Sequence, residues 1–202
     1  MKMHCTTFLF FLFAVIAHAQ SLHTTELIKN PSFEEKAEPI RNRRFGPNGE
    51  GELFGGYLPE GVILGWFVSE ESEEASMIEI TTENLIDTTQ HKALRWAISE
   101  GSATIVNVGH HGIEAAQGRQ YVLTFWAHAD KRYKGKIHVG LQSKHDYSWY
   151  AQTAVKGKIK KHWKKYTITF TADGNDPKAR FVMMAEKPGT IYLDCVSLTA
   201  AN

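Results

Sequence analysis

The run WKKYTITFT at residues 163–171 is followed by DPKARFVMM at 176–184 and by GTIYLDCVSL at 189–198. Turn-forming residues separate the three runs, since DGNDP begins at Asp173 and KPG at Lys187, and neither gap has room for a helix. Three strands that follow one another so closely predict antiparallel pairing, which is typical of a β-sandwich or jelly roll.

Within the last run the alternation of apolar side chains slips by one residue. Ile191 and Leu193 share one phase, whereas Val196 and Leu198 share the other. Such a slip predicts a β-bulge, because one extra residue in a strand shifts every later side chain to the opposite face. Bulges often direct a side chain at a functional position, so Asp194 is the first candidate ligand in the sequence.

The rest of the sequence also consists of short runs that suit strands. No segment shows convincing helical periodicity, and there is no internal repeat. Strands are expected at residues 24–29, 63–68, 76–81, 94–98, 104–108, 121–129, 136–142 and 150–155, and a long Gly- and Pro-rich loop at 37–59. We therefore expect an all-β, two-sheet antiparallel β-sandwich of the jelly-roll type.

The amino terminus has the features of an export signal. Lys2 supplies a positive charge, residues 8–16 are apolar, and Ala17-His-Ala forms a small-residue cleavage pattern. The apolar run is too short for a stable membrane span. We expect residues 1–19 to be a cleavable signal peptide, which predicts a secreted or periplasmic protein.

Residues 20–202 then form one mature domain, which is long enough for a single well-buried core. Cys5 would be removed with the signal, and Cys195 would be the only cysteine left, so no internal disulfide is expected. Stability would come from the core or from a bound metal.

The formal net charge of +1 provides no overall field for nucleic acid, but the charges are unevenly placed. Both charged runs suit solvated loops, and the basic one would alternatively suit an anionic surface such as an acidic polysaccharide. The acidic run consists of Glu70, Glu71, Glu73 and Glu74, and the basic run of Lys156, Lys158, Lys160, Lys161, Lys164 and Lys165.

The strand expected at 121–129 carries Trp126 and His128 on the face opposite its apolar stripe. The strand expected at 136–142 likewise places His138 and Gln142 opposite an apolar stripe. If the two strands are neighbours, these four side chains share one surface, and an aromatic ring among hydrogen-bonding groups suits a sugar. The alternative is that a loop covers Trp126 and that its role is structural.

Several motifs together resemble the CenC-like carbohydrate-binding modules, and more closely the module carried by family 51 α-L-arabinofuranosidases. They are ELIKNPSFEE at 26–35, GW at 65–66, GHHGI at 109–113, QGRQYVLTF at 117–125, YKG at 133–135, WKKY at 163–166 and IYLDCVSL at 191–198. The resemblance covers nearly all of the mature chain. It implies a galactose-binding-like jelly roll that recognises polysaccharide, of the plant cell-wall type.

The resemblance also implies a structural calcium ion near the chain ends. Glu34 and Asp194 are its expected side-chain ligands, with backbone carbonyls near Asn30 and Ser32. The alternative is that both carboxylates only cap backbone amides. His111 stands, with His110, where the relatives tend to carry aromatics, and it is a further candidate for sugar contact.

Nothing in the sequence indicates an active site. A glycosidase needs two carboxylates flanking the scissile bond, and no strand-borne pair stands out. The Asn-Glu dipeptide that holds the acid/base of such barrels is absent, and neighbouring His110 and His111 would point to opposite faces of a strand. Trp66 and Trp163 match positions that usually pack a core.

We therefore expect a non-catalytic polysaccharide-binding module with no nucleic-acid partner, and a glycoside hydrolase as a possible protein partner. Two alternatives stay open at this point. One is a free-standing piece of an arabinofuranosidase-like hydrolase that binds no sugar itself, and the other is a surface-interaction domain that uses the basic run.

Overall fold

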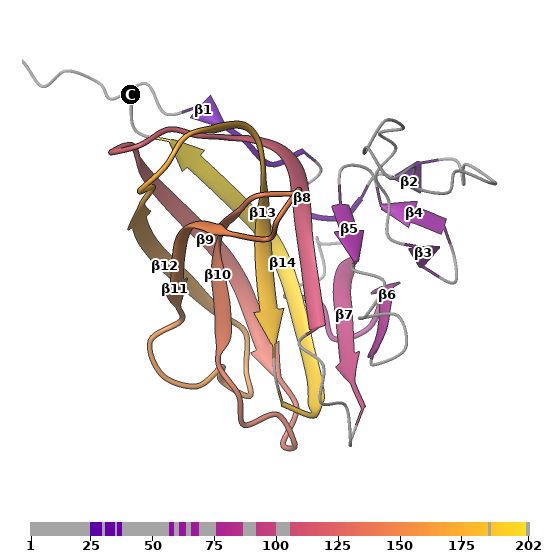
Figure 1. Cartoon of the computed structure of the whole chain (residues 1–202). Coiled ribbons are helices and arrows are strands. Elements are labelled where there is room, and N and C mark those ends of the chain that lie inside the picture. The colour runs from indigo at the N-terminus through magenta and orange to yellow at the C-terminus, as the bar shows by residue number, and fades with distance from the viewer. Residues whose placement is uncertain are drawn as a thin grey trace, which may run out of the picture.

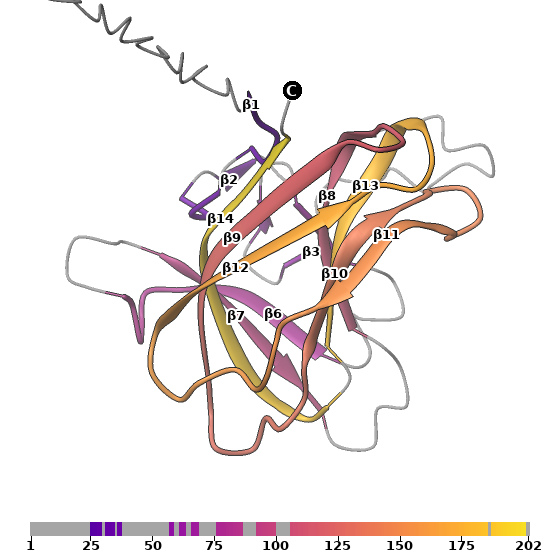
Figure 2. The ribbon, with the colours of Figure 1, turned by 90° about the vertical axis from the view of Figure 1, so that its left-hand side faces the viewer.

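The structure, a computed structural model, consists of two antiparallel sheets packed face to face, which Figure 1 shows from the front and Figure 2 from the side. It describes residues 25–29, 31–34, 36–37, 57–58, 61–63, 66–68, 76–86, 92–99, 106–185 and 187–200. Within these ranges the chain forms strands and turns, and no helix there is long and apolar enough to cross a membrane. The predicted all-β sandwich is confirmed.

One sheet has six strands, in the order β12-β9-β14-β7-β6 with β1 paired to β14. Their bounds are β1 Thr25–Glu26, β6 Ser76–Thr81, β7 Ala93–Ile98, β9 Gln120–Ala129, β12 Lys164–Thr171 and β14 Gly189–Ala200. The other large sheet has five strands in the order β11-β10-β13-β8-β5. They are β5 Trp66–Val68, β8 Val106–Ala115, β10 Ile137–Gln142, β11 Trp149–Ala154 and β13 Asp176–Ala185.

A small third sheet is built from β2 Lys36–Ala37, β4 Gly61–Ile63 and β3 Tyr57–Leu58. The rest of the loop predicted at 37–59 lies outside the described residues.

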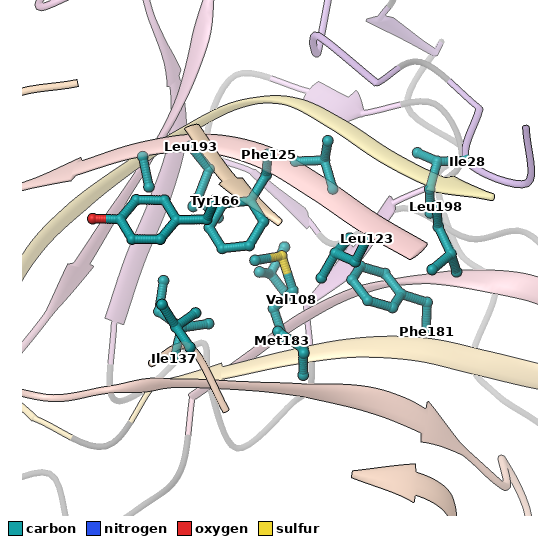
Figure 3. Close-up of a cluster of buried hydrophobic side chains, with 14 of the residues drawn as sticks. Ile28, Val108, Leu123, Phe125, Ile137, Tyr166, Phe181, Met183, Leu193 and Leu198 are labelled. Atoms are coloured by element: carbon teal, nitrogen blue, oxygen red, sulfur yellow. The ribbon is translucent and has the colours of Figure 1, made fainter. Parts of the chain in front are cut away.

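The core lies between the two large sheets and is filled by the inward side chains of each strand (Figure 3). On β9 the residues Leu123 and Phe125 are fully buried, and Phe125 stacks on Tyr166 of β12 with ring centroids 5.4 Å apart. Phe181 and Met183 of β13 face them from the other sheet. Each such side chain stabilises the fold by roughly 1.5–3 kcal/mol through removal of its apolar surface from water.

Several consecutive strands cross between the two sheets, and this differs from the expectation. β9 lies in the six-stranded sheet and β10 in the five-stranded one, so the two are not neighbours. The three final strands also alternate, because β12 and β14 pair with β9 while β13 pairs with β10 and β8. Turn residues mark where a chain reverses, but a short turn can also cross the roughly 10 Å between packed sheets.

The bulge predicted in the last strand is confirmed. The register of β14 against β9 shifts between Asp194 and Ser197, and Cys195 has a left-handed backbone with φ +49. Val196 donates its N–H to the carbonyl of Pro31 at 2.9 Å. The bulge therefore joins the last strand to the segment that follows β1.

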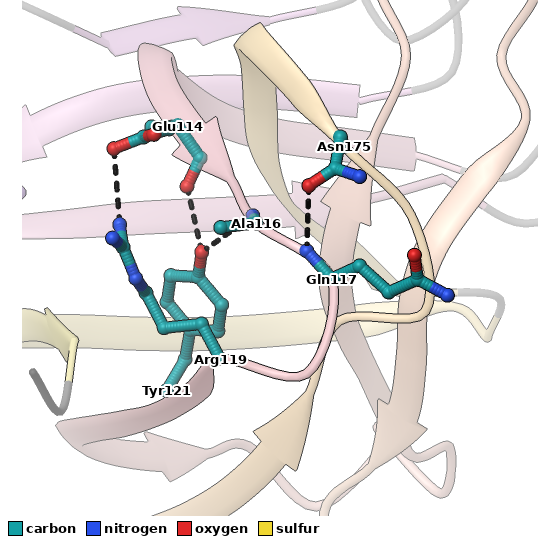
Figure 4. A network of polar contacts seen from close by, with 6 residues as sticks. All are labelled: Glu114, Ala116, Gln117, Arg119, Tyr121 and Asn175. Atoms are coloured by element: carbon teal, nitrogen blue, oxygen red, sulfur yellow. Dashed lines mark hydrogen bonds and ion pairs between the residues drawn. The ribbon is translucent and has the colours of Figure 1, made fainter.

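A buried tyrosine ties the loop between β8 and β9 to the start of β9 (Figure 4). The Tyr121 hydroxyl donates to the carbonyl of Glu114 at 2.8 Å and accepts the N–H of Ala116 at 3.1 Å. Gln117 donates its N–H to Asn175 Oδ1 at 2.9 Å, which adds a link to the turn before β13.

We expect Tyr121→Phe to lower the free energy of unfolding by about 1–3 kcal/mol, because a partly buried carbonyl and N–H lose their partner while the ring stays packed. Urea unfolding followed by tryptophan fluorescence measures the change. Tyr150→Phe, at a half-buried ring on β11, is the matched control. Equal midpoints for Tyr121→Phe and the wild type would contradict the role given to this hydroxyl.

Candidate functional site

The outer face of the five-stranded sheet carries polar side chains beside small ones. Gln142 of β10 lies directly opposite Arg180 of β13, and in the next outward-facing row Gly140 lies opposite Val182. Val182 in turn pairs with Gly109 of β8, so this middle row holds little side-chain bulk. The face is therefore low at its centre and polar along one side.

Trp149, the first residue of β11, lies over this middle row. It pairs with Gln142, two residues along β10 from Gly140, and its indole comes within 3.0 Å of the position that a Cβ would take on Gly140. The ring also packs on Val182 and Met184, which form an apolar cluster separate from the main core. The half-buried indole thus rests on an apolar bed outside the sandwich.

A buried pair of polar groups lies beside the indole. Arg180 donates from Nε and Nη2 to Gln142 Oε1 at 3.0 and 2.5 Å, and its guanidinium lies 4.7 Å from the ring centroid of Tyr147. Burial lowers the pKa of Arg180. Gln142 completes the unit by donating from Nε2 to the Tyr147 carbonyl at 2.8 Å.

The loop that presents Tyr147 is held by its own hydrogen bonds. Asp146 Oδ1 accepts from the N–H and the hydroxyl of Ser148, and the hydroxyl of Ser143 accepts from His145 N–H at 3.2 Å. Hydrogen bonds from Ser143 and Ser148 lower the pKa of Asp146 to about 2. The Tyr147 ring is 62% exposed and its backbone is left-handed at φ +61, so a large aromatic ring is fixed in solvent.

The outer face of the six-stranded sheet carries a different aromatic cluster. His128 stacks on Tyr192 at 4.4 Å and meets the edge of Trp163 at 4.6 Å. Asn84 covers the cluster, because its carbonyl accepts from Trp163 Nε1 at 2.7 Å and its amide donates to the Tyr192 hydroxyl at 3.3 Å. These rings are engaged with one another rather than presented to a ligand.

Protonation of His128 is expected to destabilise the fold. Burial lowers the pKa of His128, and its Nε2 is buried with no hydrogen-bond partner among the described residues. As pH falls below about 6.5 the unfolded chain takes up a proton that the folded chain resists, so the free energy of unfolding falls until the folded pKa is passed. His128→Phe keeps the ring stack and should flatten this slope.

Chemical denaturation between pH 7.5 and pH 5 measures that slope, with the exposed His162→Gln as the matched control. A slope that persists unchanged in His128→Phe would assign the pH dependence to another group.

The surface expected to combine Trp126, His128, His138 and Gln142 is not formed. Trp126 and His128 lie on the outer face of the six-stranded sheet, and His138 and Gln142 lie on the outer face of the five-stranded sheet, on the opposite side of the sandwich. The face assignment within each strand is confirmed, but the condition for a shared surface is not met, because β9 and β10 are not neighbours. The backbone of His111 on β8 pairs with that of Arg180 on β13, so His111 lies in the same row across the sheet as Gln142 and Arg180.

Trp66 and the histidine next to His111 are structural. Trp66 is buried against Phe33 at 4.8 Å, as expected. His110 is buried and accepts the N–H of Lys29 at Nε2, 3.1 Å away. Trp163 differs from the expectation, because it is half-buried on the outer face against His128 and not in the core.

The residues expected to hold calcium lie where the first segment meets the last strand. Asp194 is fully buried, and its Oδ1 accepts the N–H of Cys195 at 2.6 Å. The Lys92 ammonium donates to the Glu34 carbonyl at 2.5 Å and lies 3.7 Å from its carboxylate. Ser32 directs its hydroxyl to Cys195 Sγ at 3.7 Å.

These oxygens suit calcium in kind, but the described residues do not form a cage for it. Among them no three His, Cys, Asp or Glu side chains gather, and the Lys92 ammonium already contacts Glu34. Asn30 lies outside the described residues.

Sequence reasoning missed Trp149, Tyr147 and Arg180. The segment DYSW at 146–149 lies between two expected strands, and two aromatic residues so close together in a polar loop are a signal for a binding surface. Gly140 was a second signal, because a glycine inside a strand marks a place where another group comes close to the backbone.

Residues 25–189 match the sequence profile of a family described as a carbohydrate binding domain. A solved structure described as CBM4 is similar, with a TM-score of 0.55 and 20% identity over 86% of this chain and 99% of that one. A structure from Bacteroides thetaiotaomicron VPI-5482, whose name proposes sugar binding, has a TM-score of 0.53 and 17% identity over the same shares. At these identities the two structures show the fold, and no curated protein matches the chain.

Proposed function

Because the chain belongs to this family of carbohydrate binding domains, we propose that it binds polysaccharide on the outer face of the five-stranded sheet. It is a binding module and not an enzyme, as its family and its CBM4-type fold indicate. Two outer faces are available in the sandwich, and the choice between them rests on which aromatic ring is presented to a ligand.

The observation that carries the proposal is the Trp149 indole held over Val182 and Met184 beside the Arg180–Gln142 pair. The C–H faces of a sugar ring pack on an indole, while its hydroxyls need donors and acceptors at the edge of that ring. The buried Gln142–Arg180 pair lies at the edge of the indole, and Gln142 holds the loop that presents Tyr147, a second aromatic ring. On the opposite face the His128 ring is stacked on Tyr192 and covered by Asn84.

The ligand that fits this face best is an uncharged polysaccharide of the plant cell-wall type. Its recognition here depends on two aromatic rings and few charges, and His138 extends the same sheet face on one side of the centre. Each stacking contact contributes roughly 1 kcal/mol and must offset the ordering of the ligand, so affinity for one chain is modest.

The finer assignments are also proposals. The motifs that resemble CenC-like modules and the module of family 51 α-L-arabinofuranosidases support plant-type glycans and a glycoside hydrolase as partner. The sequence at residues 1–19, outside the described residues, supports export to a secreted or periplasmic location.

Affinity electrophoresis tests the proposal, with xylan, arabinan, mixed-linkage β-glucan and galactan each copolymerised into a native gel. We expect slower migration in at least one of these neutral polysaccharides and none in a gel without sugar. Slowing by none of them would instead favour a module that packs against a hydrolase without holding sugar.

Calcium binding remains a separate prediction, and its test is thermal. If an ion joins Glu34 to the last strand, a chelator should lower the melting temperature, because a ligand that binds only the folded state stabilises it. Calorimetry with and without EDTA measures this, and Lys92→Met serves as the comparison variant. An unchanged melting temperature in EDTA together with a lower one in Lys92→Met would show that the Lys92 ammonium, and not a calcium ion, stabilises the fold at Glu34.

A further inference from the structure

Six lysines lie between residues 156 and 165, a segment that we call the lysine ridge. They are Lys156, Lys158, Lys160, Lys161, Lys164 and Lys165, and all are exposed. The ridge occupies the connection between β11 and β12 and the first two residues of β12.

The backbone under the ridge is fixed at several points. Val155 and Ile159 are buried, and Val155 donates its N–H to the carbonyl of Ile137 at 2.9 Å. Lys160 donates its N–H to the Tyr166 hydroxyl at 2.9 Å, and its carbonyl accepts from Ala129 at 2.8 Å. The lysines are therefore presented from an ordered loop, not from a freely solvated run.

No acidic side chain neutralises the ridge within the described part of the chain. The four ion pairs found there involve Lys92, Arg95, Arg119 and Arg132. Lys164 has an aromatic contact, with its ammonium 5.8 Å from the Tyr166 ring centroid. Like charges held close together repel one another, and such a field attracts an anionic partner.

The ridge borders an aromatic and hydroxyl-bearing sheet face. Lys165 lies directly opposite Trp126, and Thr167 opposite Thr124, on the outer face of the six-stranded sheet. The Trp126 indole is half-buried, and the threonine of β12 is exposed. Lysines on the edge strand β12 also discourage strand pairing between molecules, but this explains only Lys164 and Lys165.

We propose that the lysine ridge and Trp126 form a second site, which binds a polysaccharide bearing carboxylate or sulfate groups. The ammonium groups contact the anionic substituents, and Trp126 stacks on a sugar ring next to the threonine hydroxyls. The proposal rests on the function above only in taking the ligand to be a sugar. One half-buried indole with hydroxyls beside it suits a sugar chain better than a series of nucleobases.

Isothermal titration calorimetry with polygalacturonate and with dextran sulfate tests this site, and fully methyl-esterified polygalacturonate and dextran are the uncharged counterparts. We expect binding to at least one anionic polymer and loss of that binding at high salt, because the contacts are exposed charges. Binding of polygalacturonate alone would identify the carboxylate as the recognised group, and binding of dextran sulfate alone the sulfate.

The double variant Lys160→Glu with Lys161→Glu should weaken anionic binding about tenfold or more. Lys29→Glu with Lys178→Glu makes the same change in net charge at exposed positions away from the ridge, and it should retain binding. Trp126→Ala should weaken it several-fold, whereas Trp149→Ala should leave it unchanged, which separates this site from the neutral one.

An equal loss of anionic binding in both double variants would show that net charge, and not the position of the lysines, governs binding. That result would overturn the proposal. Tighter binding of single-stranded DNA than of either anionic polysaccharide would overturn the assignment to sugar.

Discussion

Trp149→Ala is expected to abolish measurable binding of the neutral polysaccharide while the protein stays folded. The indole supplies the flat apolar surface of the proposed site, and Val182 and Met184 beneath it cannot replace a ring. The loss should be at least tenfold in affinity, about 1.4 kcal/mol or more, since aromatic rings at the centre of a site carry much of the binding energy. Affinity electrophoresis in the gel that slows the wild type measures it.

The matched control for this change is Trp126→Ala. Both indoles are half-buried on outer faces, but they lie on opposite sheets. We expect Trp126→Ala to migrate like the wild type in the neutral polysaccharide. A Trp149→Ala protein with normal melting and full retardation would refute the proposed face.

Gly140→Ala is expected to lower the free energy of unfolding more than the addition of a single methyl group elsewhere in the five-stranded sheet. A Cβ at this position would lie 1.9 Å from the Ala151 carbonyl oxygen and 3.0 Å from the Trp149 ring. Because the first of these atoms is backbone, β10 and β11 would have to separate, at a cost of about 3 kcal/mol. Urea denaturation should show this loss, and the displaced indole should weaken sugar binding as well.

Gly118→Ala is the control for that experiment. Gly118 has φ +81, and nothing lies within 4 Å of the position of its Cβ. The free energy of unfolding of Gly118→Ala should fall by only about 1 kcal/mol, because alanine disfavours the left-handed backbone, and sugar binding should be normal. Gly140 is not among the glycines with positive φ, so equal losses for the two variants would show that the contact with Ala151 costs little and would contradict this prediction.

The sequence predicted the fold class because strand signals are local. Alternating side chains placed β6 at its observed bounds, and the phase slip at Asp194 predicted the bulge of β14. The assignment of strands to sheets was beyond local signals, because a turn such as KPG suits a hairpin and a crossover equally well. β8 extends to Ala115, well past its expected end at residue 108. The sequence did not predict this extension, because GHHGI lacks the alternation that marks a strand.

The same limit explains the outcome at the candidate site. Periodicity placed His138 and Gln142 correctly on an outward face, since side chains alternate along any strand. It could not show that Arg180, 38 residues away, lies opposite Gln142, or that Trp149 folds over Gly140. Those contacts depend on the partner strands β13 and β11, which no local pattern identifies.

The central claim is that neutral sugar binds over Trp149 on the five-stranded sheet. The five tryptophans give five indole N–H signals in a nitrogen–proton correlation spectrum, and Trp66 and Trp96 are buried in the core. On titration with an oligosaccharide of the bound polysaccharide, we predict the largest shift for the indole of Trp149. A largest shift at Trp126 or Trp163, with Trp149 unmoved, would contradict it.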